Sequence, residues 1–246
     1  MKNVAVFITV TLIVFMFLPY ASYGEDFYLK QKSTTTGMMD QPSQVSYQEI
    51  WVTKDKIKSV DTGNNQEFIL RLDTGKVCMI SPKSKIYTEF EIDKFKEFAK
   101  MGMGMLQSQK DNPSTTEVKK TGETQKIGKW NCYQVQVTHT GPVNFSSEMW
   151  LTDDLKIKLE DYRHFSSELG VSQMLGDMFE KMKEIKGFPV KQIISMQMNT
   201  MNVQTTTEVI DVVIKSIPDT VFDIPEDFKK NDFNMPPAPA KSYSKH

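Results

Sequence analysis

Short runs of alternating apolar and polar residues dominate the chain after its first 24 residues. A period of two places successive side chains on opposite faces of a strand, so these runs predict β-strands. The first group is predicted at 44–53, 57–61, 67–72, 76–80 and 85–90. Turn residues such as Gly63-Asn64-Asn65 and Ser81-Pro82-Lys83 separate them, and the pattern therefore predicts an antiparallel meander.

The period changes after residue 90, where apolar residues recur at three- and four-residue spacing. This spacing predicts an amphipathic helix that carries Ile92, Phe95, Phe98, Ala99, Met105 and Leu106 on one side. A second group of strands is predicted at 117–121, 131–138, 145–152 and 156–162, then a second amphipathic helix at 167–186, and two last strands at 190–203 and 204–215. Gly187 ends the second helix. The chain is therefore predicted to be one α+β domain.

The two ends of the chain differ from this pattern. Lys2 precedes an apolar run at 4–18, Pro19 ends the run, and Ser22-Tyr23-Gly24 supplies small residues for cleavage. A membrane anchor needs about 20 apolar residues, and this run is shorter. We expect a signal peptide at 1–24, a domain at 25–228 in the periplasm or secreted, and a disordered Pro/Ala-rich tail at 229–246.

Charge narrows the choice of partners. Lys and Arg number 30 and Asp and Glu number 31. A nearly balanced chain has no field that would favour nucleic acid or an anionic membrane as its main partner. Arginine, the usual reader of phosphate, occurs only as Arg71 and Arg163. We expect no nucleic-acid partner, no transmembrane segment after signal cleavage, and no cofactor.

No catalytic set is indicated. Asp61-Thr62-Gly63 and Asp73-Thr74-Gly75 spell the motif of aspartic proteases, but each stands where a hairpin must turn, and these residues are favoured in turns. Only His139 and His164 lie in the predicted domain, and neither belongs to a Gly-flanked Ser or Cys motif. We therefore predict no catalytic residue, no metal site and a protein that is not an enzyme.

Cys78 and Cys132 are the two cysteines of the chain, and both lie inside predicted strands. An oxidising compartment permits a disulfide between them. A disulfide also requires Cα atoms within about 7 Å of each other, and the pattern does not specify that distance. Two separate buried thiols are the alternative.

Methionine is in excess, with 16 residues in the chain, and nine of them are grouped at 101–105, 174–182 and 196–201. Thioethers suit Cu(I), and methionine also suits an adaptable surface for apolar ligands. A third interpretation is ordinary core, because Met178 and Met182 follow the apolar stripe of the second helix and Met196 alternates with polar neighbours. All three interpretations remain open at this stage.

Several segments resemble the repeated hairpins of periplasmic proteins related to the LolA/LolB lipoprotein carriers. They are Tyr47–Val52, Lys56–Val60, Ile80–Tyr87, the Trp-containing strand and acidic turn Glu148–Leu155, and Phe222–Phe228 at the end of the predicted domain. The chain is most similar to a branch of that superfamily that carries a domain of unknown function. The resemblance implies a curved antiparallel half-barrel with two helices covering its concave face, which holds acyl chains in the characterised relatives.

This resemblance and the strand pattern together suggest a ligand cavity. Its predicted lining from the strands is Phe68, Leu70, Leu72, Tyr133, Val135, Val137, Ile194, Met196 and Met198. Its predicted lining from the helices is Phe95, Phe98, Met178 and Met182. The leading hypothesis is an exported, non-enzymatic carrier or chaperone of an acyl chain or other apolar ligand. The alternatives are an envelope structural or interaction protein with a filled core, and a Met-rich copper-binding protein.

Overall fold

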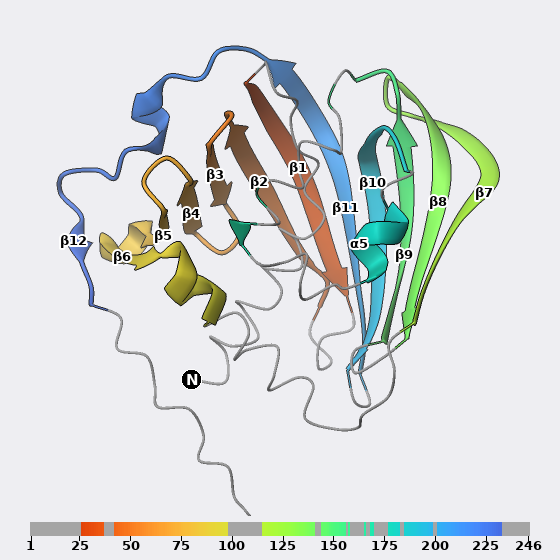
Figure 1. Cartoon of the computed structure of the whole chain (residues 1–246), viewed down its shortest axis with the longest axis horizontal. Helices are drawn as coiled ribbons and strands as arrows, with labels where there is room; N and C mark the ends of the chain where they lie inside the picture. Colours follow the sequence, from red (N-terminus) through yellow and green to blue (C-terminus); the bar gives the residue numbers. More distant parts are fainter. Residues whose placement is uncertain are drawn as a thin grey trace, which may run out of the picture.

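A single large β-sheet forms the molecule. The computed structural model describes residues 26–36, 42–97, 115–140, 144–155, 157, 165, 168–169, 177–182, 185–198 and 201–232. Within them, twelve strands form one curved sheet in the order β12-β6-β5-β4-β3-β2-β1-β11-β10-β9-β8-β7 (Figure 1). Because β12 and β7 lie at opposite ends of this order, the sheet is open.

The strands follow one another in space much as they do in the chain. Their bounds are β1 (Phe27–Thr36), β2 (Gln44–Val52), β3 (Lys56–Asp61), β4 (Gln66–Arg71), β5 (Lys76–Ser81), β6 (Ile86–Glu91), β7 (Thr115–Ile127), β8 (Trp130–Thr140), β9 (Asn144–Thr152), β10 (Phe188–Met198), β11 (Met201–Ile214) and β12 (Lys229–Lys230). All neighbours pair antiparallel except β12 and β6, which are parallel. The predicted meander is confirmed as β2–β6, with strand ends within one residue of the prediction at most positions.

The Asp-Thr-Gly motifs are turns, as predicted. The Asp61 carboxylate accepts hydrogen bonds from the backbone N–H of Gly63 and of Asn64, at 2.9 and 3.1 Å. Asp73 and Gly75 lie in the turn between β4 and β5, where Gly75 has φ of +68°. A carboxylate that accepts from the N–H groups two and three residues later stabilises a turn locally. The protease interpretation is not needed.

Three strand predictions were incomplete or wrong. β1 was not predicted, because only its first half carries apolar residues, and it lies between β2 and β11. β7 does not end near Thr121 but runs for 13 residues through Gly122, with a change of register between Lys120 and Thr124. The last two strands meet between Met198 and Met201 rather than at residue 203, since the alternation of side chains continues across that point.

The described helical segments are short. They are η1 (Pro82–Ser84), helix 92–97, α5 (Asp177–Met182) and η3 (Asp219–Phe222). Most of the two predicted helices, the predicted strand at 156–162, the signal peptide and residues 233–246 lie outside the described residues. Beyond Phe228, the end of the predicted domain, β12 pairs with β6. None of the helices among the described residues has the length and hydropathy needed to span a bilayer.

The two faces of the sheet bury different clusters. Directly paired residues share a face, so the register places Leu29, Ile50, Ile57 and Leu70 on one face, here called the inner face. The opposite, outer face carries Ile69 and Ile80, and residues 217–228, here called the closing segment, cover them through Ile217 and Phe222. The closing segment thus covers the outer face at β4 and β5, and the inner face is where the predicted ligand site would lie.

Candidate functional site

One apolar cluster on the inner face extends from β6 across the middle strands of the sheet to β10, and its part at β3–β6 holds four predicted lining residues. These four residues, Phe68, Leu70, Leu72 and Phe95, pack together there, and Leu70 is completely buried. Helix 92–97 follows β6 directly, and the Phe95 ring lies 6.0 Å from Phe68 and 6.5 Å from Phe90 between ring centroids. Tilted and edge-on ring pairs at these distances are favourable. They hold the helix against the sheet.

A second apolar cluster lies on β8 and β9. Tyr133, Val135 and Val137 share one face of β8, and Ile185 and Met182 pack against the same cluster from α5 and its following loop. Lys181 donates a hydrogen bond to the carbonyl of Thr116 on β7. The Tyr133 hydroxyl donates to the carbonyl of Lys186, and burial raises the pKa of this tyrosine, with Asp153 adding to the effect. These bonds fasten the α5 region to the sheet.

Next to these two apolar clusters, part of the inner face is polar. Six side chains on five neighbouring strands form this region, here called the polar belt: Gln31, Ser33, Gln48, Ser147, Gln192 and Thr207. They pair across the strands: Gln31 donates to Gln48 at 2.6 Å, Ser33 and Thr207 share a hydrogen bond of 3.1 Å, and Gln192 donates to Ser147 at 2.9 Å. All except Thr207 are buried.

The register shows that the belt and the clusters belong to one surface. Val135 pairs with Met149, Met149 with Gln192, Gln192 with Thr207, and Thr207 with Ser33, so this row crosses from β8 to β1 on one face. On β1, Gln31 is the next inward position after the buried Leu29 and comes before Ser33. The inner face therefore carries the polar belt beside its apolar clusters, on strands that also contribute apolar residues, and it is not apolar throughout as predicted.

The sequence did contain a signal for the belt. Gln31 and Ser33, and on the next strand Ser46 and Gln48, occupy alternate positions in line with Leu29 and Ile50. A search for apolar alternation overlooks this pattern, because glutamine and serine are counted as exposed. Only the pairing of the strands reveals that these polar positions face inward.

The remaining predicted lining residues divide into two groups. Ile194 is buried and Met196 is half-buried, and both share the inner face of β10 with Gln192. Phe98 lies outside the described residues, as do the side chains of Met178 in α5 and Met198 in β10. The residues that the structure describes do not test whether the predicted set lines a cavity.

Comparison with known proteins assigns the family. Residues 39–228 match the family described as "Domain of unknown function (DUF4412)". The chain belongs to this family. The prediction of a family of unknown function is confirmed. No curated protein matches the chain significantly in sequence.

Solved structures similar to the DUF4412 protein have low sequence identity to it. A LolA superfamily protein from Nitrosomonas europaea is 8% identical, with 82% of this chain and 92% of that chain covered and a TM-score of 0.36. A DUF1329 family protein from Desulfovibrio piger is 9% identical, with 82% and 91% covered and a TM-score of 0.33. The PNGF-II structure is 14% identical, with a TM-score of 0.37. The match covers 85% of this chain but only 31% of the PNGF-II chain, so this chain spans less than a third of that protein's length.

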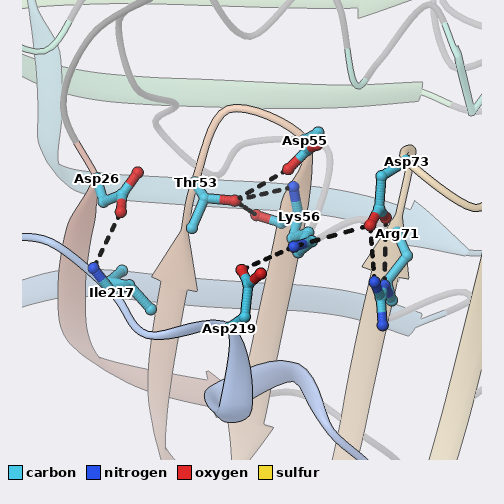
Figure 2. A network of polar contacts seen from close by, with 8 residues as sticks. All are labelled: Asp26, Thr53, Asp55, Lys56, Arg71, Asp73, Ile217 and Asp219. Carbon is cyan, nitrogen blue, oxygen red and sulfur yellow. Dashed lines mark hydrogen bonds and ion pairs between the residues drawn. The ribbon is translucent and has the colours of Figure 1, made fainter.

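A charged cluster on the DUF4412 domain lies at one end of β3 and β4 (Figure 2). Lys56 Nζ is 2.8 Å from Asp219 Oδ1 and 3.7 Å from Asp73 Oδ2, and Arg71 donates to the same Asp73 carboxylate at 2.7 Å. The hydrogen bond to Asp219 raises the pKa of Lys56, and the one from Arg71 lowers the pKa of Asp73. Every cation has a carboxylate partner.

This charged cluster has a structural role. Lys56 also lies 5.9 Å above the ring of Phe222, and Asp26 accepts a hydrogen bond from the N–H of Ile217 at 2.9 Å. These contacts attach η3 to β1 and β3. A lysine that keeps its proton is a poor nucleophile and a poor base, so the cluster offers a clamp for the closing segment rather than a reaction site.

The structure decides between the two alternatives that the sequence left open for the cysteines. Cys78 and Cys132 are both free and buried. Cys78 on β5 belongs to the outer-face cluster, whereas Cys132 on β8 belongs to the larger core cluster, and seven strands separate β5 from β8 in the sheet. Burial, reinforced by Glu89, raises the pKa of the Cys78 thiol to about 11, and burial also raises the pKa of Cys132. The alternative of two separate buried thiols is the correct one.

The described residues bear on only part of the metal question. No group of three His, Cys, Asp or Glu residues that could hold a metal occurs in the described part of the chain. His139 contacts Thr116 at 2.9 Å and stacks on Phe145 at 5.1 Å, and His164 lies outside the described residues. Met101, Met103 and Met105 lie outside them as well, so copper binding stays a prediction.

Proposed function

We propose that this DUF4412 protein is an exported, non-enzymatic carrier or chaperone that binds an acyl chain or another apolar ligand on the inner face of its sheet. The observation that carries the proposal is the arrangement of the two apolar clusters on one face of an open, curved sheet. An open sheet can admit a long ligand from its edge, whereas a closed barrel cannot.

The energetics favour a chain-like ligand. Each methylene removed from water contributes about 0.8 kcal/mol, so affinity should rise about fourfold per methylene until the apolar surface is filled. The side chains facing the ligand would include Phe68 and Phe95 at one end and Val135 and Met182 at the other. No step of bond making or breaking is needed for this activity.

The test is lipid analysis of the purified protein, followed by binding of acyl chains of increasing length to the delipidated protein. Phe68→Ala should weaken binding, because Phe68 is on the inner face. Its neighbour Ile69 is buried on the outer face, so Ile69→Ala is a matched control that lowers stability without lowering affinity. The proposal would be overturned if no lipid co-purified with the protein and no added acyl chain bound to it.

A second candidate is an interaction protein of the cell envelope with a filled core. It is favoured by exposed apolar side chains on the middle strands: Val45 and Tyr47 on β2, and Ile210 and Val213 on β11. Apolar side chains gathered on a surface are common at protein interfaces. Crosslinking would favour this candidate over the carrier if it recovered one defined protein partner and if Tyr47→Ser abolished the crosslink. The purified protein should then also contain no bound lipid.

A further inference from the structure

The polar belt is unusual because its hydrogen bonding is incomplete. Gln31 is 2% exposed and Gln48 is 5% exposed, and a single amide–amide bond joins them. That bond uses one N–H group and one carbonyl. Among the described residues, neither the Gln31 carbonyl nor the Gln48 amide nitrogen makes another hydrogen bond.

Buried amides normally satisfy both of their polar ends. A buried polar group without a partner destabilises the folded protein, and apolar side chains at these positions would remove that penalty. The same applies to Gln192, whose amide nitrogen binds Ser147 and whose carbonyl makes no bond among the described residues. The inner face therefore holds hydrogen-bond acceptors, the Gln31 and Gln192 carbonyls, and a donor, the Gln48 amide nitrogen, that make no bond among the described residues.

The belt is also electrically neutral. All of its six side chains are amides or hydroxyls. The carboxylate that faces Gln48 across β2 and β3 is Asp61, which is already engaged by the N–H groups of its own turn. A neutral site with both donors and acceptors matches an ester, an amide or a hydroxyl group better than a phosphate or a free carboxylate, which prefer cationic donors.

From these observations we infer that the polar belt binds a neutral hydrogen-bonding group of an amphipathic ligand, such as a glycerol ester or an amide-linked acyl chain. This inference rests on the proposed carrier function and names its ligand class. The neighbouring apolar clusters contact the hydrocarbon parts, and the belt orients the ligand by its polar group. A pure hydrocarbon would give no partner to the carbonyls of Gln31 and Gln192 or to the amide nitrogen of Gln48.

The experiment compares two probes on the delipidated full chain: 1-monooleoylglycerol, which carries an ester and hydroxyls, and diphenylhexatriene, a hydrocarbon. In Q31M/Q48M both amides become apolar side chains of similar size. We expect the affinity for 1-monooleoylglycerol to fall about five- to tenfold, while the affinity for diphenylhexatriene stays within about twofold. Thr35 and Thr205 on the same face satisfy each other at 3.1 Å, so T35V/T205V is the control that leaves both affinities unchanged.

The outcomes separate the two proposals. If wild type binds both probes and Q31M/Q48M changes them equally, the belt inference is overturned and the carrier function stands. Binding of neither probe to wild type overturns both. Circular dichroism and thermal unfolding establish that the variant is folded; should Q31M/Q48M not fold, Q192M/S147A makes the same comparison on β10 and β9, with the same loss expected.

Discussion

Lys56 and Asp219 are 163 residues apart in the chain, and the Lys56 ammonium lies 2.8 Å from the Asp219 carboxylate. The lysine side chain is 9% exposed, whereas the aspartate side chain is 83% exposed. Removal of Asp219 therefore leaves a buried ammonium group, whereas removal of Lys56 leaves a carboxylate in water. This pair fastens the closing segment to the sheet at β3.

Removing the aspartate should cost more stability than removing the lysine. Asp219→Ala leaves a buried ammonium with only the more distant Asp73, and we expect a loss of about 1–3 kcal/mol in the free energy of unfolding. Lys56→Met leaves Asp219 in water and keeps the apolar stem, so its effect should stay below about 1 kcal/mol. Urea unfolding monitored by tryptophan fluorescence measures both; equal losses would contradict the assignment.

Acid should weaken the same cluster. The hydrogen bond from Arg71 lowers the pKa of Asp73 below its ordinary value of 3.8. A carboxylate with a depressed folded-state pKa contributes stability above its unfolded pKa, and this contribution is lost as the pH falls through the folded pKa. We expect the difference in stability between wild type and Asp73→Asn to be constant from pH 7 to about pH 5 and to shrink below about pH 4.

Thermal unfolding at several pH values measures this difference. Lys85 and Asp227 form an exposed ion pair on the surface, and exposed pairs contribute little to stability. Lys85→Met is therefore the control, and its stability should stay close to that of wild type at every pH. A difference between wild type and Asp73→Asn that grows towards low pH would contradict the expected sign.

The two thiols should be free and unreactive in the native protein. The Cys78 thiol has a pKa raised to about 11 by burial, and alkylation requires the thiolate. We expect no labelling of Cys78 or Cys132 by iodoacetamide at pH 8 over minutes, and complete labelling of both after unfolding. Mass spectrometry of non-reduced protein that shows a mass lower by two hydrogens would overturn the free-thiol assignment.

Gly187 should resist substitution more strongly than Gly122. Both have positive φ, +85° and +83°. A Cβ at Gly187 would lie 2.9 Å from the Thr152 carbonyl oxygen, whereas nothing lies within 4 Å of a Cβ at Gly122. Gly122→Ala should therefore cost about 1 kcal/mol from its backbone conformation alone, and Gly187→Ala about 2–3 kcal/mol.

The pair of glycine variants tests the junction between β9 and β10, where Gly187 precedes Phe188. Differential scanning calorimetry of the two single variants gives the comparison directly. Equal shifts in melting temperature would mean that the close approach of Gly187 to Thr152 does not exist in solution.

Local patterns determined much of this protein. The alternation of Ile50 and Val52 against Trp51 specified a strand and its buried side, and Asp61 and Gly63 specified a turn, because strand period and turn chemistry act over a few residues. The grouping of Phe68 and Leu70 with Phe95 also followed, since helix 92–97 comes directly after the hairpins that it covers.

Only the tertiary structure decided which distant strands became neighbours. Pairing of β1 with β11 placed Ser33 beside Thr207 and made the polar belt, and the separation of β5 from β8 kept Cys78 away from Cys132. The same holds for Lys56 and Asp219. Such contacts depend on the order of all twelve strands in the sheet, which no local pattern of apolar and polar residues encodes.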